Sequence, residues 1–197
     1  MKYPSLILIL CEGKTEKLYF NSLITNMHIK RVEIEIFENQ GQHKALIDKC
    51  VEMREKYSIE LEENEENIEV WAVCDHDEMS KNNKKLTYQK LLAYAKENNV
   101  NLAFSEPQFE AYLIQHFGCR KIRKSKKELE EYLNGCVLEH YNTEYSKSNL
   151  EWVDRMIDET PHKINEAIKN ADNFSNHTTK PFLTVQKLAK RLIDLAP

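Results

Sequence analysis

Acidic residues follow two apolar segments of the chain, directly where each segment ends. Glu12 comes after the run Ser5–Cys11, and Asp75 and Asp77 come after the run Ile68–Cys74. The first run is continuously apolar, as is typical of a strand buried on both faces of a parallel sheet, and chemistry in such sheets gathers beyond the carboxyl ends of the strands. We therefore expect Glu12, Asp75 and Asp77 to lie close together at one edge of a sheet.

Carboxylates at such an edge indicate a metal site, because neighbouring carboxylates repel one another unless protons or a cation neutralise them. Oxygen ligands suit Mg²⁺ or Mn²⁺, which take one or two carboxylates together with substrate phosphate oxygens. The Asp-x-Asp spacing would let Asp75 and Asp77 reach the same ion. A lone Asp-x-Asp is usually a solvated loop, and the Glu12-Gly13 pair after the first strand is what favours the metal site.

Four further charged residues are candidates for the same site. Lys14 lies near the start of an expected helix, where anions are favoured, and we expect it to contact phosphate unless it is simply solvated. Glu16, one helical turn after Glu12, is either a supporting carboxylate of the site or an ordinary acidic residue in a first helical turn. Glu110 lies in an apolar helical segment, which suggests pairing with the site or with Lys147.

A basic run indicates a surface for nucleic acid. Six of the eight residues in Arg120–Lys127 are basic. We expect Arg120, Lys121 and Arg123, together with Lys147, to contact phosphate groups, with a solvated face as the alternative. The net charge of −4, from 28 Lys and Arg against 32 Asp and Glu, argues against general coating of polyanions but not against local contact.

Two histidines lie near these segments. His43 follows Gly41, which ends the second expected strand, and is a weaker candidate for the same edge. His116 and Phe117 end an apolar segment, and we expect them to close the core rather than to bind metal.

The order of apolar segments predicts an α/β fold. Strand-like and helix-like segments alternate up to Pro107, which indicates a parallel sheet of about four strands with right-handed crossovers. The expected strands are 5–11, 32–37, 68–74 and 101–104, and the helices between them are 15–27, 42–57 and 86–97. Only helices are expected beyond Pro107. Capping boxes at 125–128 and 148–151 start two of them, and Gly135 is expected to end the first.

Composition fits one compact unit. The chain has 197 residues, of which 41% are hydrophobic, enough for a packed core. We expect residues 1–117 to form the α/β core and residues 118–197 a helical extension packed on it. No run approaches the roughly 18 apolar residues of a membrane span, and no secretory signal is evident, so we expect a cytoplasmic protein. Five widely spaced cysteines without a C-x-x-C motif indicate neither a disulfide framework nor a zinc site.

The order strand–Glu12-Gly13–helix, strand–Gly41–helix, strand–Asp75-x-Asp77 resembles the Toprim domain of topoisomerases, primases and related nucleases. Three segments narrow the resemblance to RloB-like proteins. Residues 12–20 read E-G-K-T-E-K-L-Y-F, residues 70–77 form an apolar strand that ends in D-x-D, and residues 105–117 read S-E-P-Q-F-E-A-Y-L-I-Q-H-F. The last segment is similar to the S-N-P-x-F-E-x-W-L-L-x-H-F motif of that family.

The resemblance implies a Toprim-like Rossmannoid sheet and a metal-dependent nuclease. Asp75 and Asp77 would hold Mg²⁺ or Mn²⁺, and Glu12 would ligate the metal or act as general acid or base. DNA or RNA would be the substrate, in phage defence or abortive infection, with an AAA-type ATPase as partner and a homo-oligomer as one assembly. The alternative is a non-catalytic nucleic-acid-binding or regulatory subunit of an ATPase-containing defence complex.

Overall fold

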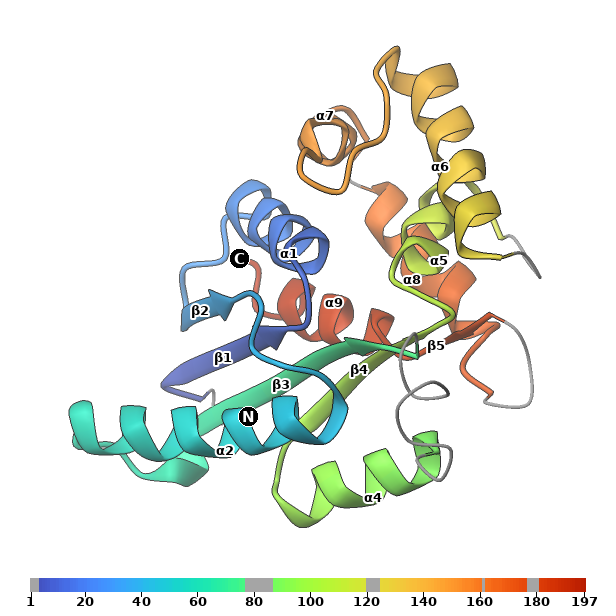
Figure 1. Cartoon of the computed structure of the whole chain (residues 1–197). Helices are drawn as coiled ribbons and strands as arrows, with labels where there is room; N and C mark the ends of the chain where they lie inside the picture. The colour runs from blue at the N-terminus through green and yellow to red at the C-terminus, as the bar shows by residue number, and fades with distance from the viewer. Residues whose placement is uncertain (1–3, 77–86, 120–124, 161, 177–180) are drawn as a thin grey trace.

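A mostly parallel sheet forms the centre of the molecule (Figure 1). The computed structural model describes residues 4–76, 87–119, 125–160, 162–176 and 181–197. Within them the strand order is β2-β1-β3-β4-β5, with the first four strands parallel and β5 antiparallel to β4. The strands are β1 (Leu6–Cys11), β2 (Glu33–Phe37), β3 (Ile68–Asp75), β4 (Asn101–Glu106) and β5 (Phe182–Leu183). The arrangement is a Rossmann-like α/β fold.

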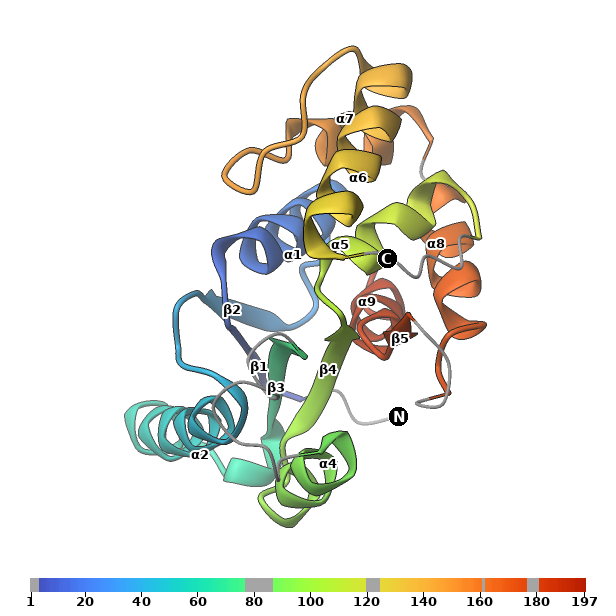
Figure 2. The same ribbon diagram turned by 45° about the vertical axis from the view of Figure 1, so that its right-hand side comes forward.

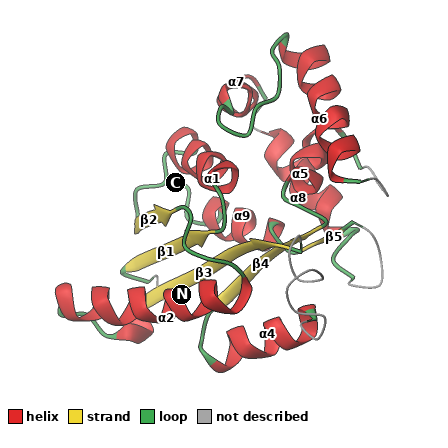
Figure 3. Ribbon diagram, in the orientation of Figure 1, coloured by secondary structure: helices red, strands yellow, loops and turns green. Residues whose placement is uncertain are grey.

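Helices cover both faces of the sheet, as its apolar strands require. On one face lie α2 (His43–Glu60) and α4 (Tyr88–Glu97), and on the other lie α1 (Lys14–Asn26) and α9 (Gln186–Ile193) (Figures 2 and 3). Successive residues of β1 alternate between the two cores: Leu6, Leu8 and Leu10 face α2, whereas Ile7, Ile9 and Cys11 face α1. The prediction that this strand is buried on both faces is confirmed.

The second half of the chain is mostly helical and packs on the α1 face. It contains α5 (Glu110–Leu113), the 3₁₀ helix η2 (Ile114–Phe117), α6 (Lys126–Tyr141), α7 (Glu151–Glu159) and α8 (His162–Asp172) before α9. One hydrophobic cluster joins Tyr19 of α1 to Trp152 of α7 and Leu188 of α9, so a single core crosses residue 117. A short 3₁₀ helix, η1 (Glu65–Asn67), precedes β3.

Three local expectations differ from the structure. The fifth strand, β5, lies where only helices were expected, because its two residues are too few to show strand periodicity. Gly135 does not end α6, which continues to Tyr141 and ends at Asn142 in the left-handed conformation, φ 52°. The reason is that a glycine inside a helix costs only about 1 kcal/mol, and the buried face of α6 continues past it.

The two expected capping boxes have different outcomes. Ser125 and Glu128 form one at the start of α6, as predicted. The predicted capping box at 148–151 is wrong, because α7 begins at Glu151. The backbone N–H of Glu151 donates to the Asn149 side chain, 2.9 Å away, and not to Ser148. Ser148 lies instead in the candidate site described below. None of the helices in the described ranges is long and apolar enough to span a membrane.

Candidate functional site

A pocket of about 410 Å³ lies at the carboxyl edge of the sheet. Five parts of the chain form its wall: the turn from β1 into α1, the connection from β2 into α2, the end of β3, the start of α5, and the loop before α7. The lining residues are Glu12, Gly13, Lys14, Thr15, Glu16, Gln42, Asp75, Phe109, Glu110, Lys147 and Ser148. Its volume lies within the roughly 300–1,000 Å³ range of ligand pockets in proteins.

Asp75, the last residue of β3, is fixed by hydrogen bonds to its backbone and its side chain. Its backbone N–H donates to Glu12 Oε2 over 3.1 Å. The parallel register of β3 and β4 places Ser105 opposite Asp75, and the Ser105 hydroxyl donates to Asp75 Oδ1 over 2.5 Å. Desolvation of the carboxyl group, followed by repulsion from Glu16, raises the pKa of Asp75 well above its usual value, against the lowering effect of Ser105.

Glu16, in the first turn of α1, is buried, with 5% of its surface exposed. Burial, with repulsion from Glu110 and Glu12, raises its pKa to about 7. Gly13 makes room for this carboxylate, since a Cβ at Gly13 would lie 2.9 Å from Glu16 Oε2. The backbone of Gly13 is extended and open to any residue, so the close approach of Glu16 is what favours glycine there.

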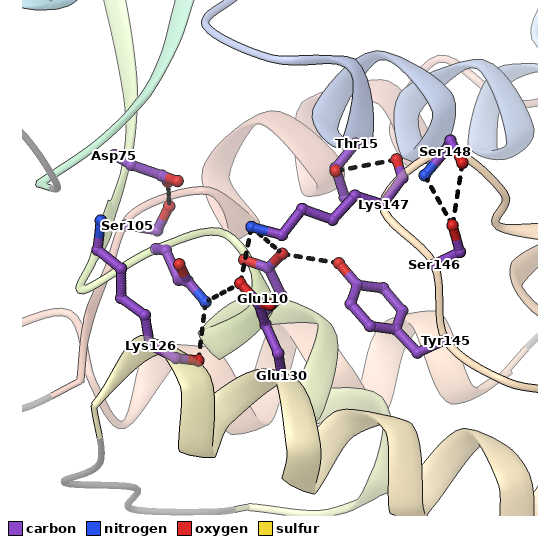
Figure 4. A network of polar contacts seen from close by, with 11 residues as sticks. Thr15, Asp75, Ser105, Glu110, Lys126, Glu130, Tyr145, Ser146, Lys147 and Ser148 are labelled. Carbon is purple, nitrogen blue, oxygen red and sulfur yellow. Dashed lines mark hydrogen bonds and ion pairs between the residues drawn. The ribbon is translucent and has the colours of Figure 1, made fainter.

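Glu110 connects the pocket to the helical half of the chain (Figure 4). It is 2% exposed. Its Oε1 accepts a hydrogen bond from the Tyr145 hydroxyl at 2.7 Å and forms an ion pair with Lys147 Nζ at 3.2 Å. Lys147 Nζ also lies 2.8 Å from Glu130 Oε1. The backbone carbonyl of Lys147 accepts a hydrogen bond from the Thr15 hydroxyl. Burial tends to lower the pKa of Lys147, but its two carboxylate partners outweigh burial and raise it.

Six of the residues expected from sequence line this one pocket: Glu12, Lys14, Glu16, Asp75, Glu110 and Lys147. The expected pairing of Glu110 with Lys147 is present. Asp77, Arg120, Lys121 and Arg123 lie outside the described residues. His116 is buried in the core, as expected, where it contacts Tyr19.

Several polar residues of the site were not expected. Ser105 could have been found by the same reasoning as Asp75, because it too lies at the carboxyl end of an apolar strand. Thr15, Tyr145 and Glu130 gave no comparable signal, since their contacts join segments far apart in the sequence.

The lining suits a hard cation, because its donors are carboxylate oxygens rather than sulfur or imidazole nitrogen. Within the described ranges, no group of three or more His, Cys, Asp and Glu side chains is placed to hold a metal ion. Glu12 and Asp75 line the pocket, and Asp77 is outside those ranges. Burial is the largest cause of the raised pKa values of Glu16 and Asp75, and repulsion between neighbouring carboxylates adds to it. The donor set therefore fits a cation without forming a finished cage.

Comparison with known proteins identifies a family. Neither a curated protein nor a solved structure matches the sequence significantly. Residues 7–192 match the family of RloB-like proteins. The match covers the sheet except the first residue of β1, the pocket and nearly all of the helical half. The chain therefore belongs to the RloB-like protein family.

Proposed function

We propose that this RloB-like protein is a metal-dependent nuclease that hydrolyses phosphodiester bonds in DNA or RNA. The observation that carries the proposal is one pocket that combines four carboxylates with two lysines at the carboxyl edge of a parallel sheet. The carboxylates provide oxygen ligands for a cation, and the lysines provide charge for the phosphate group that such a cation would attract.

In this proposal Glu12, Asp75 and Asp77 hold Mg²⁺ or Mn²⁺. When bound, the metal would stabilise charge on the phosphoryl oxygens and activate water for in-line attack. The Ser105 hydroxyl holds the orientation of the Asp75 carboxylate by donating a hydrogen bond to it. The Glu12 carboxylate is held at the end of β3 because it accepts a hydrogen bond from the backbone N–H of Asp75.

The remaining charged residues of the pocket bind substrate and exchange protons. Lys14 is exposed in the first turn of α1, where the helix N-terminus adds to its attraction for phosphate. Lys147 lines the same pocket from the loop before α7. Glu16 has a pKa of about 7, so both its protonated and ionised forms are populated near neutral pH and it suits proton transfer.

The resemblance to RloB-like proteins extends the proposal to biology. The proposal includes Toprim-type nuclease chemistry, a role in phage defence or abortive infection, and an AAA-type ATPase partner. Arg120, Lys121 and Arg123 would lengthen the path for the nucleic acid, and the activity would be cytoplasmic. A homo-oligomer is one assembly in which it could operate.

A second candidate is a non-catalytic subunit that binds nucleic acid or regulates an ATPase. Two observations favour it: the described acidic and histidine side chains do not form a finished metal cage, and Lys147 is already engaged by Glu110 and Glu130. In this case the pocket would dock a phosphate group, and a partner would supply the chemistry.

A cleavage assay separates the two functions. Purified protein is incubated with Mg²⁺ or Mn²⁺ and with duplex DNA, single-stranded DNA and tRNA, beside Asp75→Asn and the control Asp158→Asn on the exposed face of α7. Metal-dependent cleavage by the wild type and the control, but not by Asp75→Asn, supports the nuclease. Nucleic-acid binding without cleavage, unchanged by Asp75→Asn even with an ATPase partner added, overturns it in favour of the second candidate.

A further inference from the structure

The loop from β2 into α2 spans the ends of the two strands that carry the site acids. The backbone N–H of Gln40 donates to the Cys11 carbonyl, next to Glu12, over 3.3 Å. His43 Nε2 lies 3.1 Å from the Asp75 carbonyl oxygen. One connection therefore contacts β1 and β3 at the positions from which Glu12 and Asp75 project.

The chemistry of this contact fixes the form of the His43 ring. A carbonyl oxygen only accepts hydrogen bonds, so Nε2 must carry the proton and donate it. The ring is nearly buried, 9% exposed, which shields the bond from competing water. His43 thus acts as a hydrogen-bond donor to Asp75 from outside the sheet.

The backbone around His43 adopts conformations that the start of a helix does not require. Gly41 has φ 103°, and His43, the first residue of α2, has φ 49°. The left-handed conformation costs a residue other than glycine roughly 1–2 kcal/mol, and it persists where the surrounding structure holds the residue in it. Here the surroundings include the hydrogen bond to Asp75.

We propose that His43 is a positioning residue of the site: it holds the end of β3, and with it the Asp75 carboxylate, in place for binding a divalent cation. This inference rests on the proposed metal-dependent function. With it, Asp75 is held at its N–H by Glu12, at its carboxylate by Ser105 and at its carbonyl by His43. Of these three contacts, only that of His43 comes from the start of α2, directly after the β2–α2 connection, so it couples that connection to the metal site.

The test uses two substitutions of equal length, His43→Gln and His43→Met. Both suffer the same backbone strain, but only glutamine carries an N–H that can donate to the Asp75 carbonyl. Mn²⁺ affinity is measured by calorimetry, and kcat and KM are measured at one pH where the wild type cleaves. His140→Met is the matched control, because the ring of His140 also donates to a backbone carbonyl, that of Cys136 at 2.9 Å, outside the site.

We expect His43→Met to weaken Mn²⁺ binding by about 10-fold or more, as loss of a group behind a metal ligand typically does. Its kcat should fall while KM changes little, and His43→Gln should restore most of the loss. Thermal unfolding identifies any effect of stability alone. Equal Mn²⁺ affinity in the two variants overturns the inference.

Two further observations separate the inference from the proposed function. Asp75→Asn is measured in the same series. If the wild type and Asp75→Asn bind Mn²⁺ equally weakly, the metal-dependent function fails. If only Asp75→Asn loses binding, the His43 inference alone fails. Nitrogen NMR of the wild-type imidazole is independent of both, and finding His43 protonated on Nδ1 with Nε2 bare would also overturn the inference.

Discussion

Two polar clusters lie between the same helices and differ in how their charges are satisfied. The pocket cluster contains Glu16 of α1 and Glu110 of α5. One helical turn further along, the aromatic cluster joins Tyr19 of α1, Tyr112 of α5 and His116 of η2. Burial does not distinguish them, since Glu16 is 5% exposed and His116 is 3% exposed.

The aromatic cluster is complete without any charge. His116 Nδ1 lies 3.0 Å from the Leu113 carbonyl and must donate to it, so Nε2 is free to accept from the Tyr19 hydroxyl at 3.1 Å. Tyr112 extends the chain of hydroxyl groups by contacting Tyr19 at 3.2 Å. Burial lowers the pKa of His116 to about 4, which keeps the ring neutral near pH 7.

The pocket cluster leaves negative charge unbalanced. Lys147 lies beside Glu110, yet burial and repulsion from Glu110 and Glu12 still raise the pKa of Glu16 to about 7. Buried charge of one sign is costly unless something neutralises it. The comparison teaches that the aromatic cluster is a structural element, whereas the pocket cluster costs stability in a way that a bound cation would relieve.

The largest expected effect comes from removing one charge of the pocket. Asp75→Asn should lower metal-dependent cleavage by at least about 100-fold, beyond the usual loss for a group behind a metal ligand. Without metal at pH 8, the same change should raise the free energy of unfolding, because it removes repulsion but keeps an oxygen for Ser105. Cleavage rates and urea unfolding measure the two effects, and a loss of both activity and stability would contradict this account.

The aromatic cluster should respond in the opposite way. His116 has a folded-state pKa of about 4, below its ordinary value of 6.5, so the unfolded chain binds a proton more readily. Stability from the neutral ring is present above pH 6.5 and is lost as pH falls towards 4, by up to about 3 kcal/mol. Urea unfolding of wild type and His116→Gln measures this loss, and an equal acid dependence of the two proteins would exclude it.

Glu16 gives the mirror image of this behaviour. Its folded-state pKa of about 7 lies above the ordinary 4.5, so the folded chain favours the protonated form. That stability is present below pH 4.5 and is lost as pH rises through 7, by up to about 3 kcal/mol. Glu16→Gln should flatten the dependence between pH 5 and 8, as measured by urea unfolding. Flattening by an exposed control such as Glu166→Gln as well would show that Glu16 is not its source.

A bound cation should reverse the cost of the pocket. Mg²⁺ or Mn²⁺ at about 100 times its dissociation constant would stabilise the folded chain by about 2.7 kcal/mol. We expect a larger rise in melting temperature at pH 8 than at pH 5, because protons compete with the cation for the raised carboxylates. The rise should vanish in Asp75→Asn and persist in Tyr19→Phe, and equal rises in both would place the cation elsewhere.

Much of the sheet could be predicted from sequence because its strands are buried on both faces. The run Leu6–Cys11 is continuously apolar, and β3 is apolar from Val70 to Cys74, just before Asp75. These runs identified the edge where Glu12 and Asp75 lie. The two-residue β5 has no periodicity of its own and exists through pairing with β4. It could not be predicted from local pattern.

The composition of the site was predictable, but its electrostatics were not. Spacing relative to strand ends identified Glu12, Glu16 and Asp75 without a structure. The pKa of Glu16 is raised first by its burial and then by repulsion from Glu110, nearly a hundred positions away in the chain. Likewise, the serine-to-glutamate spacing at Ser148 resembles a cap, yet tertiary contacts place that residue at the pocket.

The smallest effects come from substituting two glycines, of which Gly13 lines the pocket and Gly135 lies inside α6, away from it. Gly13→Ala would bring a Cβ to 2.9 Å from Glu16 Oε2, and the carboxylate would have to move, because it is the end of a flexible side chain. Gly135→Ala, inside α6 with nothing within 4 Å of the new Cβ, should raise the free energy of unfolding by about 0.5–1 kcal/mol.

We therefore expect Gly13→Ala to change the pH dependence of stability between pH 5 and 8 and to weaken Mn²⁺ binding by a few-fold. Gly135→Ala should leave both unchanged while raising the melting temperature. Urea unfolding at several pH values and calorimetry with Mn²⁺ measure these differences. If Gly13→Ala raised stability uniformly and bound Mn²⁺ like the wild type, the room beside Gly13 would have no role in placing Glu16. The difference between the pocket and the aromatic cluster would then depend on residues beyond the first turn of α1.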